Sequence, residues 1–92
     1  MALVIVNKRT ELHLARFEDA QPGSRAVIQD AVLLLERHPL IGPCVPNSNT
    51  DRRRLVISHG KTGYVALYRY DRANDTVFIL AVRHQREAGF AP

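Results

Sequence analysis

The sequence predicts an α+β domain, in which an N-terminal short strand and one or two helices pack on a C-terminal antiparallel three-stranded meander. In the first half of the chain, residues 25–37 carry apolar side chains at the spacing of one helical face. In the second half, three runs rich in β-branched and aromatic residues alternate with short turn signals. Helices followed by strands favour a layered fold with the helices on one face of the sheet.

Length and composition indicate one globular domain spanning residues 1–92. A chain of 92 residues has room for one modest core, and its hydrophobic share of 46% is too high for a disordered chain. The apolar stretch at residues 2–6 is too short for the hydrophobic region of a signal peptide, and no run approaches a membrane span. Cys44 is the only cysteine, so no internal disulfide can form and a cytoplasmic location is expected.

The first quarter of the chain predicts a strand followed by a helix. Residues 3–6 suit a brief strand. Residues 8–20 have a helical composition with a weak apolar stripe: Leu12, Ala15 and Phe17. The Gln-Pro-Gly-Ser segment then interrupts the helix, and Ser24 is a suitable N-cap for the next one.

Residues 25–37 are the clearest predicted helix. The apolar positions that recur at helical spacing are Val27, Ile28, Ala31, Leu34 and Leu35. Val32 and Leu33 widen this apolar face, so we expect the helix to be substantially buried. Pro39 ends it, and the proline- and glycine-containing segment that follows predicts a loop.

Residues 55–58, 64–70 and 76–82 are the predicted strands. The links between them are short and therefore favour antiparallel hairpins, since a parallel return needs a crossover of about a dozen residues. In the first link, Gly60 and Gly63 are expected to supply the backbone freedom of the turn. The last strand is apolar on both faces, so we expect it to be central in the sheet.

The second hairpin also permits a prediction of register. If Tyr70 opposes Thr76, one face carries Val65, Leu67 and Arg69 with Val77, Ile79, Ala81 and Arg83. The other face then carries Tyr64, Ala66, Tyr68 and Tyr70 with Phe78, Leu80, Val82 and His84. A slip by one residue would exchange the two faces. Alternation alone does not say which face the helices cover, and the tyrosine stripe is more typical of a core than of a base-stacking platform.

Neither a cofactor nor a metal ion is expected. Residues 60–62 read Gly-Lys-Thr, but the first glycine of a phosphate-binding loop would stand at the position of Leu55, and a strand follows instead of a helix. Three histidines lack ligand spacing with one another and with Cys44: His13, His38 and His59.

Positive charge is concentrated in the second half of the chain. Residues 1–46 carry five basic and five acidic side chains, whereas residues 47–92 carry eight basic and four acidic ones and supply the whole net charge of +4. This asymmetry suggests an anionic partner such as nucleic acid or an acidic protein segment, although a solvated arginine-rich surface is about as good an interpretation. The candidate binding residues are Arg52, Arg53, Arg54, Lys61 and Arg69.

The end of the last strand holds the densest cluster of reactive side chains. His84 follows Arg83 and precedes Arg86, and this like charge disfavours the imidazolium, so His84 could accept a proton. The two arginines could neutralise a phosphorane-like transition state, and Phe90 could stack on a base. These four residues could form a metal-free ribonuclease site, or could simply make a polar strand end that binds carboxylates.

Several short motifs follow one another in a distinctive order. A helix is followed by the His-Pro-Leu-Ile-Gly-Pro segment of residues 38–43, Arg54, the Gly63-Tyr64 turn and the strand end of residues 82–84, Val-Arg-His. Over about residues 26–90 this order resembles the RelE/ParE superfamily of bacterial toxins, also described as plasmid stabilization proteins. The first quarter of the chain differs from the family pattern, because relatives usually have a longer first helix and an aromatic residue after the opening strand.

The resemblance implies one of two activities. RelE-like members are mRNA interferases that cut messenger RNA in the ribosome, with basic residues at positions that match Val56, Ser58 and Val65 here. None of these three side chains can do that work. ParE-like members instead poison DNA gyrase and have no nuclease site. The missing basic residues favour the ParE-like side, while His84 keeps the nuclease interpretation open.

The resemblance also implies a type II toxin–antitoxin module, in which a cognate antitoxin wraps the toxin and covers its basic face in a hetero-oligomer. Three hypotheses result. The first is growth inhibition through DNA gyrase, the second is a ribosome-dependent mRNA endoribonuclease, and the third is a non-toxic antitoxin-binding module. No membrane partner is expected.

Overall fold

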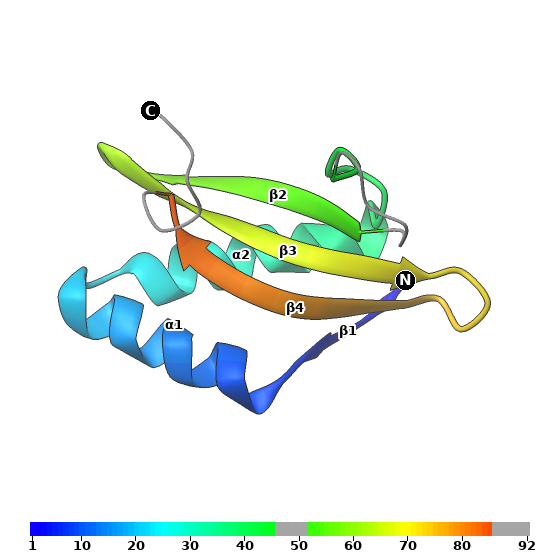
Figure 1. The fold of residues 1–92 in the computed structure, drawn as a ribbon, viewed down its shortest axis with the longest axis horizontal. Coiled ribbons are helices and arrows are strands. Elements are labelled where there is room, and N and C mark those ends of the chain that lie inside the picture. The colour runs from blue at the N-terminus through cyan, green and yellow to red at the C-terminus, as the bar shows by residue number, and fades with distance from the viewer. Residues whose placement is uncertain (46–51, 86–92) are drawn as a thin grey trace.

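Four strands form one mixed sheet, and two helices lie against one of its faces (Figure 1). The computed structural model describes residues 1–45 and 52–85. In chain order the elements are β1 (Leu3–Val6), α1 (Lys8–Ala20), α2 (Ser24–Arg37), β2 (Arg52–His59), β3 (Thr62–Asp71) and β4 (Thr76–His84). The predicted α+β fold is confirmed, including the antiparallel meander of β2, β3 and β4.

The N-terminal strand completes the sheet from the far side. The strand order is β1-β4-β3-β2, and β1 pairs with β4 in parallel, with Leu3 opposite Thr76 and Val6 opposite Ile79. A parallel pair needs a long crossover, which the two helices and the first two strands of the meander provide. As predicted, β4 lies inside the sheet, between β1 and β3.

The predicted register of the second hairpin is wrong near the turn. Asp71, rather than Tyr70, lies opposite Thr76, so Tyr68 pairs with Ile79. A β-bulge then shifts the ladder between Leu67 and Tyr68. Because a bulge adds one residue to one strand, it restores the predicted sharing of faces beyond that point. Two pairs there illustrate this: Ala66 with Val82, and Tyr64 with His84.

The first hairpin turns at two residues, Gly60 and Lys61, between the cross-strand partners His59 and Thr62. Gly60 has a φ of +61°, the conformation that a tight hairpin needs at its first central position. Gly63 does not supply turn freedom, contrary to expectation. It pairs with Ser58 within the ladder, and a Cβ there would lie 2.8 Å from the carbonyl oxygen of Ile57. Glycine is needed at residue 63 for space.

The core lies between the helices and one sheet face. Its largest fully buried side chains include Tyr64 and Tyr68 of β3 and Ile28 and Leu35 of α2. The tyrosine stripe is therefore part of the core, as the sequence favoured. α1 has 13 residues and α2 has 14. Among the described residues, no helix is long and apolar enough to cross a membrane.

The two helices bury only part of the apolar faces that were predicted for them. In α1, Leu12 is 60% exposed, and the inward positions are Thr10, Leu14 and Phe17. In α2, Ile28, Val32 and Leu35 are buried as expected, but Leu33 and Leu34 are 54% and 50% exposed. The apolar pattern of α2 is thus wider than the face that it packs on the sheet.

Glu18 of α1 caps the N-terminus of α2. Gly23, with a φ of +92°, is the N-cap, and Ser24 is the first helical residue, so the predicted Ser24 cap is wrong. The Glu18 carboxylate instead accepts hydrogen bonds from the backbone N–H groups of Gly23 and Arg25, at 2.9 and 3.2 Å. These two bonds hold the pKa of Glu18 below its ordinary value of 4.5.

We expect Glu18→Gln to destabilise the protein at neutral pH but not in acid. A depressed folded-state pKa contributes stability above the ordinary value of 4.5, and that contribution is lost as pH falls through the folded-state pKa. Urea unfolding of both proteins across pH 3 to 7 measures the difference. Asp19→Asn is the matched control, since the exposed side chain of Asp19 makes no hydrogen bond among the described residues. A difference that persists unchanged at low pH would contradict the capping role.

The loop after α2 is fastened to the edge of the sheet. The backbone N–H of Gly42 donates a hydrogen bond of 2.9 Å to the buried hydroxyl of Tyr68, and burial is the main reason that the pKa of Tyr68 is raised. The Arg54 N–H donates to the carbonyl of Pro43 at 3.1 Å, and Arg53 Nη1 donates to the carbonyl of Gly42 at 2.8 Å. The His-Pro-Leu-Ile-Gly-Pro motif is thereby fixed against β2 and β3.

Candidate functional site

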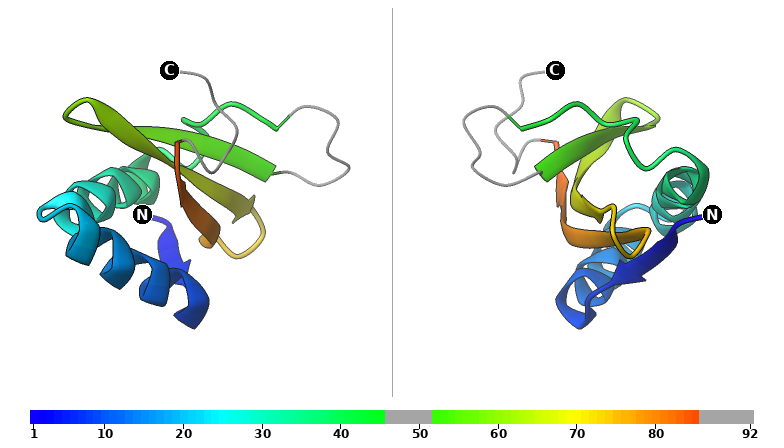
Figure 2. Two further views of the ribbon diagram at one scale, coloured as in Figure 1. Left: turned by 60° about the vertical axis from the view of Figure 1, so that its left-hand side comes forward. Right: turned by 90° about the vertical axis from the view of Figure 1, so that its right-hand side faces the viewer.

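One face of the sheet has no described helix upon it, and we call it the open face (Figure 2). Side chains alternate along each strand, so the residues between the core positions point to this face. Its members include Arg52, Arg54 and Val56 of β2, Leu67 and Arg69 of β3, and Phe78 of β4. The open face therefore combines arginines with apolar side chains.

Cross-strand pairing brings the arginines of the open face together. Arg52 lies directly opposite Arg69, and Arg54 lies opposite Leu67. The guanidinium carbon of Arg69 sits 4.9 Å from the centre of the Phe78 ring, a cation–π contact that holds the charge close to the sheet. Three of the five predicted binding residues thus share one surface.

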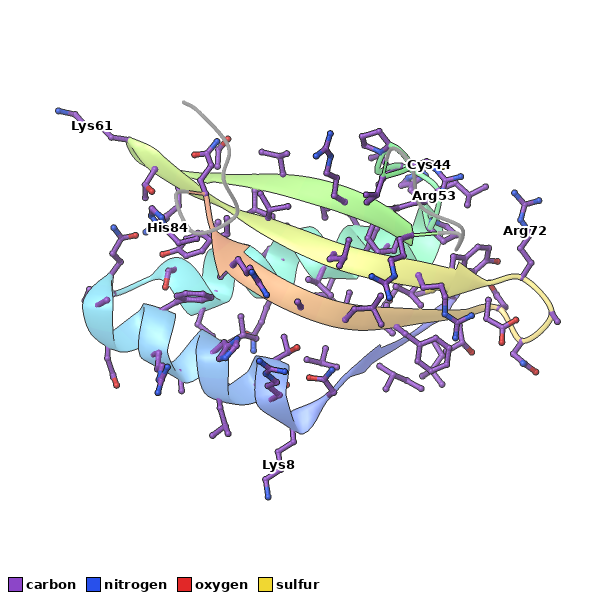
Figure 3. All side chains as sticks on the ribbon, viewed as in Figure 1. Lys8, Cys44, Arg53, Lys61, Arg72 and His84 are labelled. Atoms are coloured by element: carbon purple, nitrogen blue, oxygen red, sulfur yellow. The ribbon has the colours of Figure 1, made fainter. Side chains whose placement is uncertain are left out.

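The other two predicted binding residues lie elsewhere. Arg53 is turned toward the loop after α2, where its Nη1 donates to the carbonyls of Leu40 and Gly42. This arginine anchors the loop through Nη1, while its buried Nε has no hydrogen-bond partner among the described residues. Lys61 is at the tip of the β2–β3 hairpin and extends into solvent, far along the sheet from Arg53 (Figure 3).

His84 lies on the helix side of the sheet. Its imidazole Nε2 is hydrogen-bonded to Thr62 Oγ1 and its ring meets the edge of the Tyr64 ring at 5.4 Å between centroids. Tyr64 in turn donates a hydrogen bond of 2.8 Å to Gln21 Oε1 at the corner between the helices. This chain of contacts connects the end of β4 to the α1–α2 corner.

The four predicted nuclease residues are not all brought together by the described residues. Arg83 and His84 are neighbours in β4 but line different hollows. Arg83 lies with His13, Arg16 and Phe17 of α1, whereas His84 lines the hollow at the β2–β3 turn. Arg86 and Phe90 lie outside the described residues.

The hollow at His84 contains residues that the sequence analysis did not connect. Its volume is about 450 Å³, and its lining is Gln21, Pro22, His59, Gly60, Lys61, Thr62 and His84. A two-residue turn at residues 60–61 places His59 opposite Thr62. A turn at this place was predicted from the sequence, but the approach of His84 in β4 to Thr62 was not.

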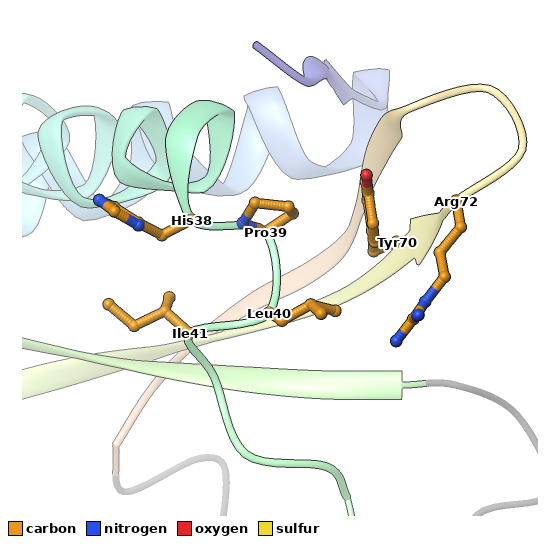
Figure 4. Close-up of a pocket in the computed structure, with 6 residues that line it drawn as sticks. All are labelled: His38, Pro39, Leu40, Ile41, Tyr70 and Arg72. Carbon is orange, nitrogen blue, oxygen red and sulfur yellow. The ribbon is translucent and has the colours of Figure 1, made fainter.

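A second concave surface lies at the opposite end of the sheet (Figure 4). It has a volume of about 630 Å³ and lies between the loop after α2 and the end of β3. We call it the loop groove, and its lining is His38, Pro39, Leu40, Ile41, Tyr70 and Arg72. Leu40 and Ile41 are 41% and 52% exposed, so the groove is apolar with basic side chains at its ends.

Known structures share this architecture. A mutant of the E. coli toxin RelE in the free state superimposes with a TM-score of 0.73, at 13% sequence identity, covering 97% of this chain and 90% of that one. The RelBE2 toxin–antitoxin complex of Mycobacterium tuberculosis contains a chain with a TM-score of 0.70 and 26% identity, covering 90% of this chain and 96% of that one. The first likeness concerns the fold alone.

Sequence comparison gives the family. A search of curated proteins found no match. The family model described as the ParE toxin of the type II toxin–antitoxin system parDE matches residues 8–89, which include both helices and the whole meander. The chain therefore belongs to the ParE toxin family of type II toxin–antitoxin systems.

Proposed function

We propose that this protein is a toxin that inhibits growth by binding and poisoning DNA gyrase, and that a cognate antitoxin neutralises it. The observation that carries the proposal is the character of the open face. Val56 and Val65, two positions where RelE-like nucleases are expected to hold basic residues, are cross-strand partners here. Val56 is 55% exposed and can contact another protein, whereas Val65 is only 7% exposed, and neither side chain can transfer protons in RNA cleavage.

The charge of the open face gives the partner its chemistry. Arg52 and Arg69 lie side by side, and Phe78 supports the second of them. Carboxylates of a partner can pair with such arginines, while apolar side chains of the partner cover the neighbouring Val56 and Leu67. An extended or helical antitoxin segment with acidic and apolar residues has these properties, and it would block the same face that gyrase meets.

The test is a supercoiling assay with purified gyrase. Wild-type protein is expected to inhibit supercoiling. The double variant Arg52→Ala/Arg69→Ala should need about tenfold more protein for the same inhibition, which corresponds to a loss of about 1.4 kcal/mol in binding free energy. Lys8→Ala/Arg37→Ala removes the same charge from exposed helix positions and should behave as wild type. His84→Ala should also retain inhibition.

Two other results would replace the proposal. Unimpaired gyrase together with transcripts cleaved on translating ribosomes, and loss of that cleavage in His84→Ala, would establish the metal-free endoribonuclease instead. The hydrogen bond between His84 and Thr62, which positions the imidazole, is the feature that favours that second candidate. A protein that binds antitoxin but causes no growth defect would be a non-toxic binding module.

A further inference from the structure

The hollow around His59 and Thr62, which we call the histidine hollow, has the composition of an anion site. It lies on the helix side of the sheet, away from the open face used in the proposed function. Its lining includes the two imidazoles of His59 and His84, the Lys61 side chain and the Thr62 hydroxyl, and no acidic side chain is among the described residues that line it.

The two imidazoles stand on either side of Tyr64. The His59 and His84 rings have centroids 6.5 and 5.4 Å from the centroid of the Tyr64 ring, on strands β2 and β4 that flank β3. Tyr64 is 1% exposed and lies beneath the hollow without lining it. The hollow that both histidines line has a volume of about 450 Å³, which is room for a small ligand.

Thr62 is the link between the histidines. It is the cross-strand partner of His59, and its Oγ1 is hydrogen-bonded to Nε2 of His84. When His84 is protonated, its Nε2–H donates to Thr62 Oγ1, and the hydroxyl hydrogen is then available to a ligand. The hollow therefore presents a hydroxyl donor and an imidazole donor side by side, with the charge of His84 behind them.

One carboxylate interacts with this charge, but without a hydrogen bond among the described residues. Glu18 interacts electrostatically with His59, while its two oxygens accept hydrogen bonds from the backbone N–H groups of Gly23 and Arg25. Lys61 extends from the hairpin tip and adds positive potential at the rim (Figure 3). The excess of donors and positive charge matches a ligand with several acceptor oxygens and negative charge.

We propose that the histidine hollow binds a phosphoryl group, contacted directly by His59 and Thr62 and attracted by His84 and Lys61. The phosphoryl group can belong to nucleic acid or to a small phosphorylated molecule. The site is separate from the open face, so it stands whether or not gyrase is the target.

NMR of the histidine side chains tests the site with the full chain and inorganic phosphate at about pH 6, where histidines ordinarily carry charge. Ionic strength is held constant with chloride. The signals of His59 and His84 should shift together and saturate, while those of His13 and His38, which lie in other parts of the molecule, should not. Equal, non-saturating shifts of all four histidines, or no shift at all, would overturn the proposal.

Two conservative variants locate the contacts. Thr62→Val keeps the branched shape that suits a strand but removes the hydroxyl, and His59→Gln keeps a polar side chain but removes the charge. Each is expected to weaken phosphate binding at least about tenfold, as for a lost charge-assisted hydrogen bond, while Arg72→Ala in the other hairpin leaves it unchanged. Unchanged binding in both variants would refute the assigned contacts.

Short oligonucleotides distinguish the source of the phosphate. Tighter saturation by a single-stranded ribotetranucleotide than by inorganic phosphate would support the site and assign it to RNA. The same result with the deoxy form as well would assign it to nucleic acid in general. Saturation by inorganic phosphate alone would support a site for small phosphorylated molecules.

Discussion

Gly42→Ala is expected to lower the free energy of unfolding by about 3 kcal/mol, at the upper end of the cost of overpacking. A Cβ at residue 42 would lie 2.5 Å from the carbonyl oxygen of Arg54 and 2.9 Å from the hydroxyl of Tyr68. The Arg54 carbonyl belongs to a strand and cannot rotate away, so the loop itself must move. That movement also breaks the buried hydrogen bond from Gly42 to Tyr68, whose length is 2.9 Å.

Urea unfolding measures this effect, and Gly60→Ala is its control. At Gly60 a Cβ would meet nothing within 4 Å, but the φ of +61° is unfavourable for alanine. The control should therefore cost only about 1 kcal/mol, from the backbone alone. If the two alanine variants were equally destabilised, loss of glycine flexibility would account for both. The close approach of Arg54 and Tyr68 to residue 42 would then make no additional contribution to stability.

The secondary structure was predictable because its signals are local. The helical spacing in residues 25–37, the glycine-containing turn after residue 58 and the β-branched runs each depend on neighbours in the chain. The predictions of burial failed where contacts between residues far apart in the chain decide which side chains are covered. The exposure of Leu12, Leu33 and Leu34 follows from which side of each helix meets the sheet, and apolar character alone does not reveal this.

The register shows the same limit in a sharper form. The bulge opposite Leu67 and Tyr68 places one extra residue in β4, between Ile79 and Ala81, and exchanges the faces of that strand, although its sequence reads as a continuous apolar run. The role of Gly42 was equally hidden, because its neighbours Arg54 and Tyr68 come from two later strands. The His-Pro-Leu-Ile-Gly-Pro motif is visible in the sequence, but the reason for a glycine at residue 42 is visible only in the folded structure.

The candidate sites were predictable in part. Charge asymmetry drew attention to Arg52, Arg54 and Arg69, and the structure places these three on one surface because alternate positions of a hairpin share a face. Charge alone could not distinguish these three from Arg53. Because side chains alternate along β2, Arg53 points away from Arg52 and Arg54 and contacts the loop after α2. The association of His84 with Thr62 depends on the register between β3 and β4, so sequence proximity instead suggested Arg83, which lines another hollow.

Tyr64→Ala is expected to destabilise the protein by about 4 kcal/mol, in the range for removing a buried aromatic side chain. Tyr64 is 1% exposed, its ring lies 4.9 Å from that of Phe17 in α1, and its hydroxyl donates to Gln21 at 2.8 Å. The side chain therefore joins the helical layer to the sheet. Since a domain of this length has a total stability of about 5–14 kcal/mol, the variant should retain only a small margin.

Tyr64→Phe separates packing from hydrogen bonding at the same residue. It keeps the ring against Phe17 and His84 but leaves Gln21 without its donor, so it should cost only about 1 kcal/mol in urea unfolding. The His84 NMR signal should move in Tyr64→Ala, because the ring beside it is lost, and remain near its wild-type position in Tyr64→Phe. If the phenylalanine variant lost as much stability as the alanine variant, the hydroxyl bond would be the main link between the layers, and the ring packing would be secondary.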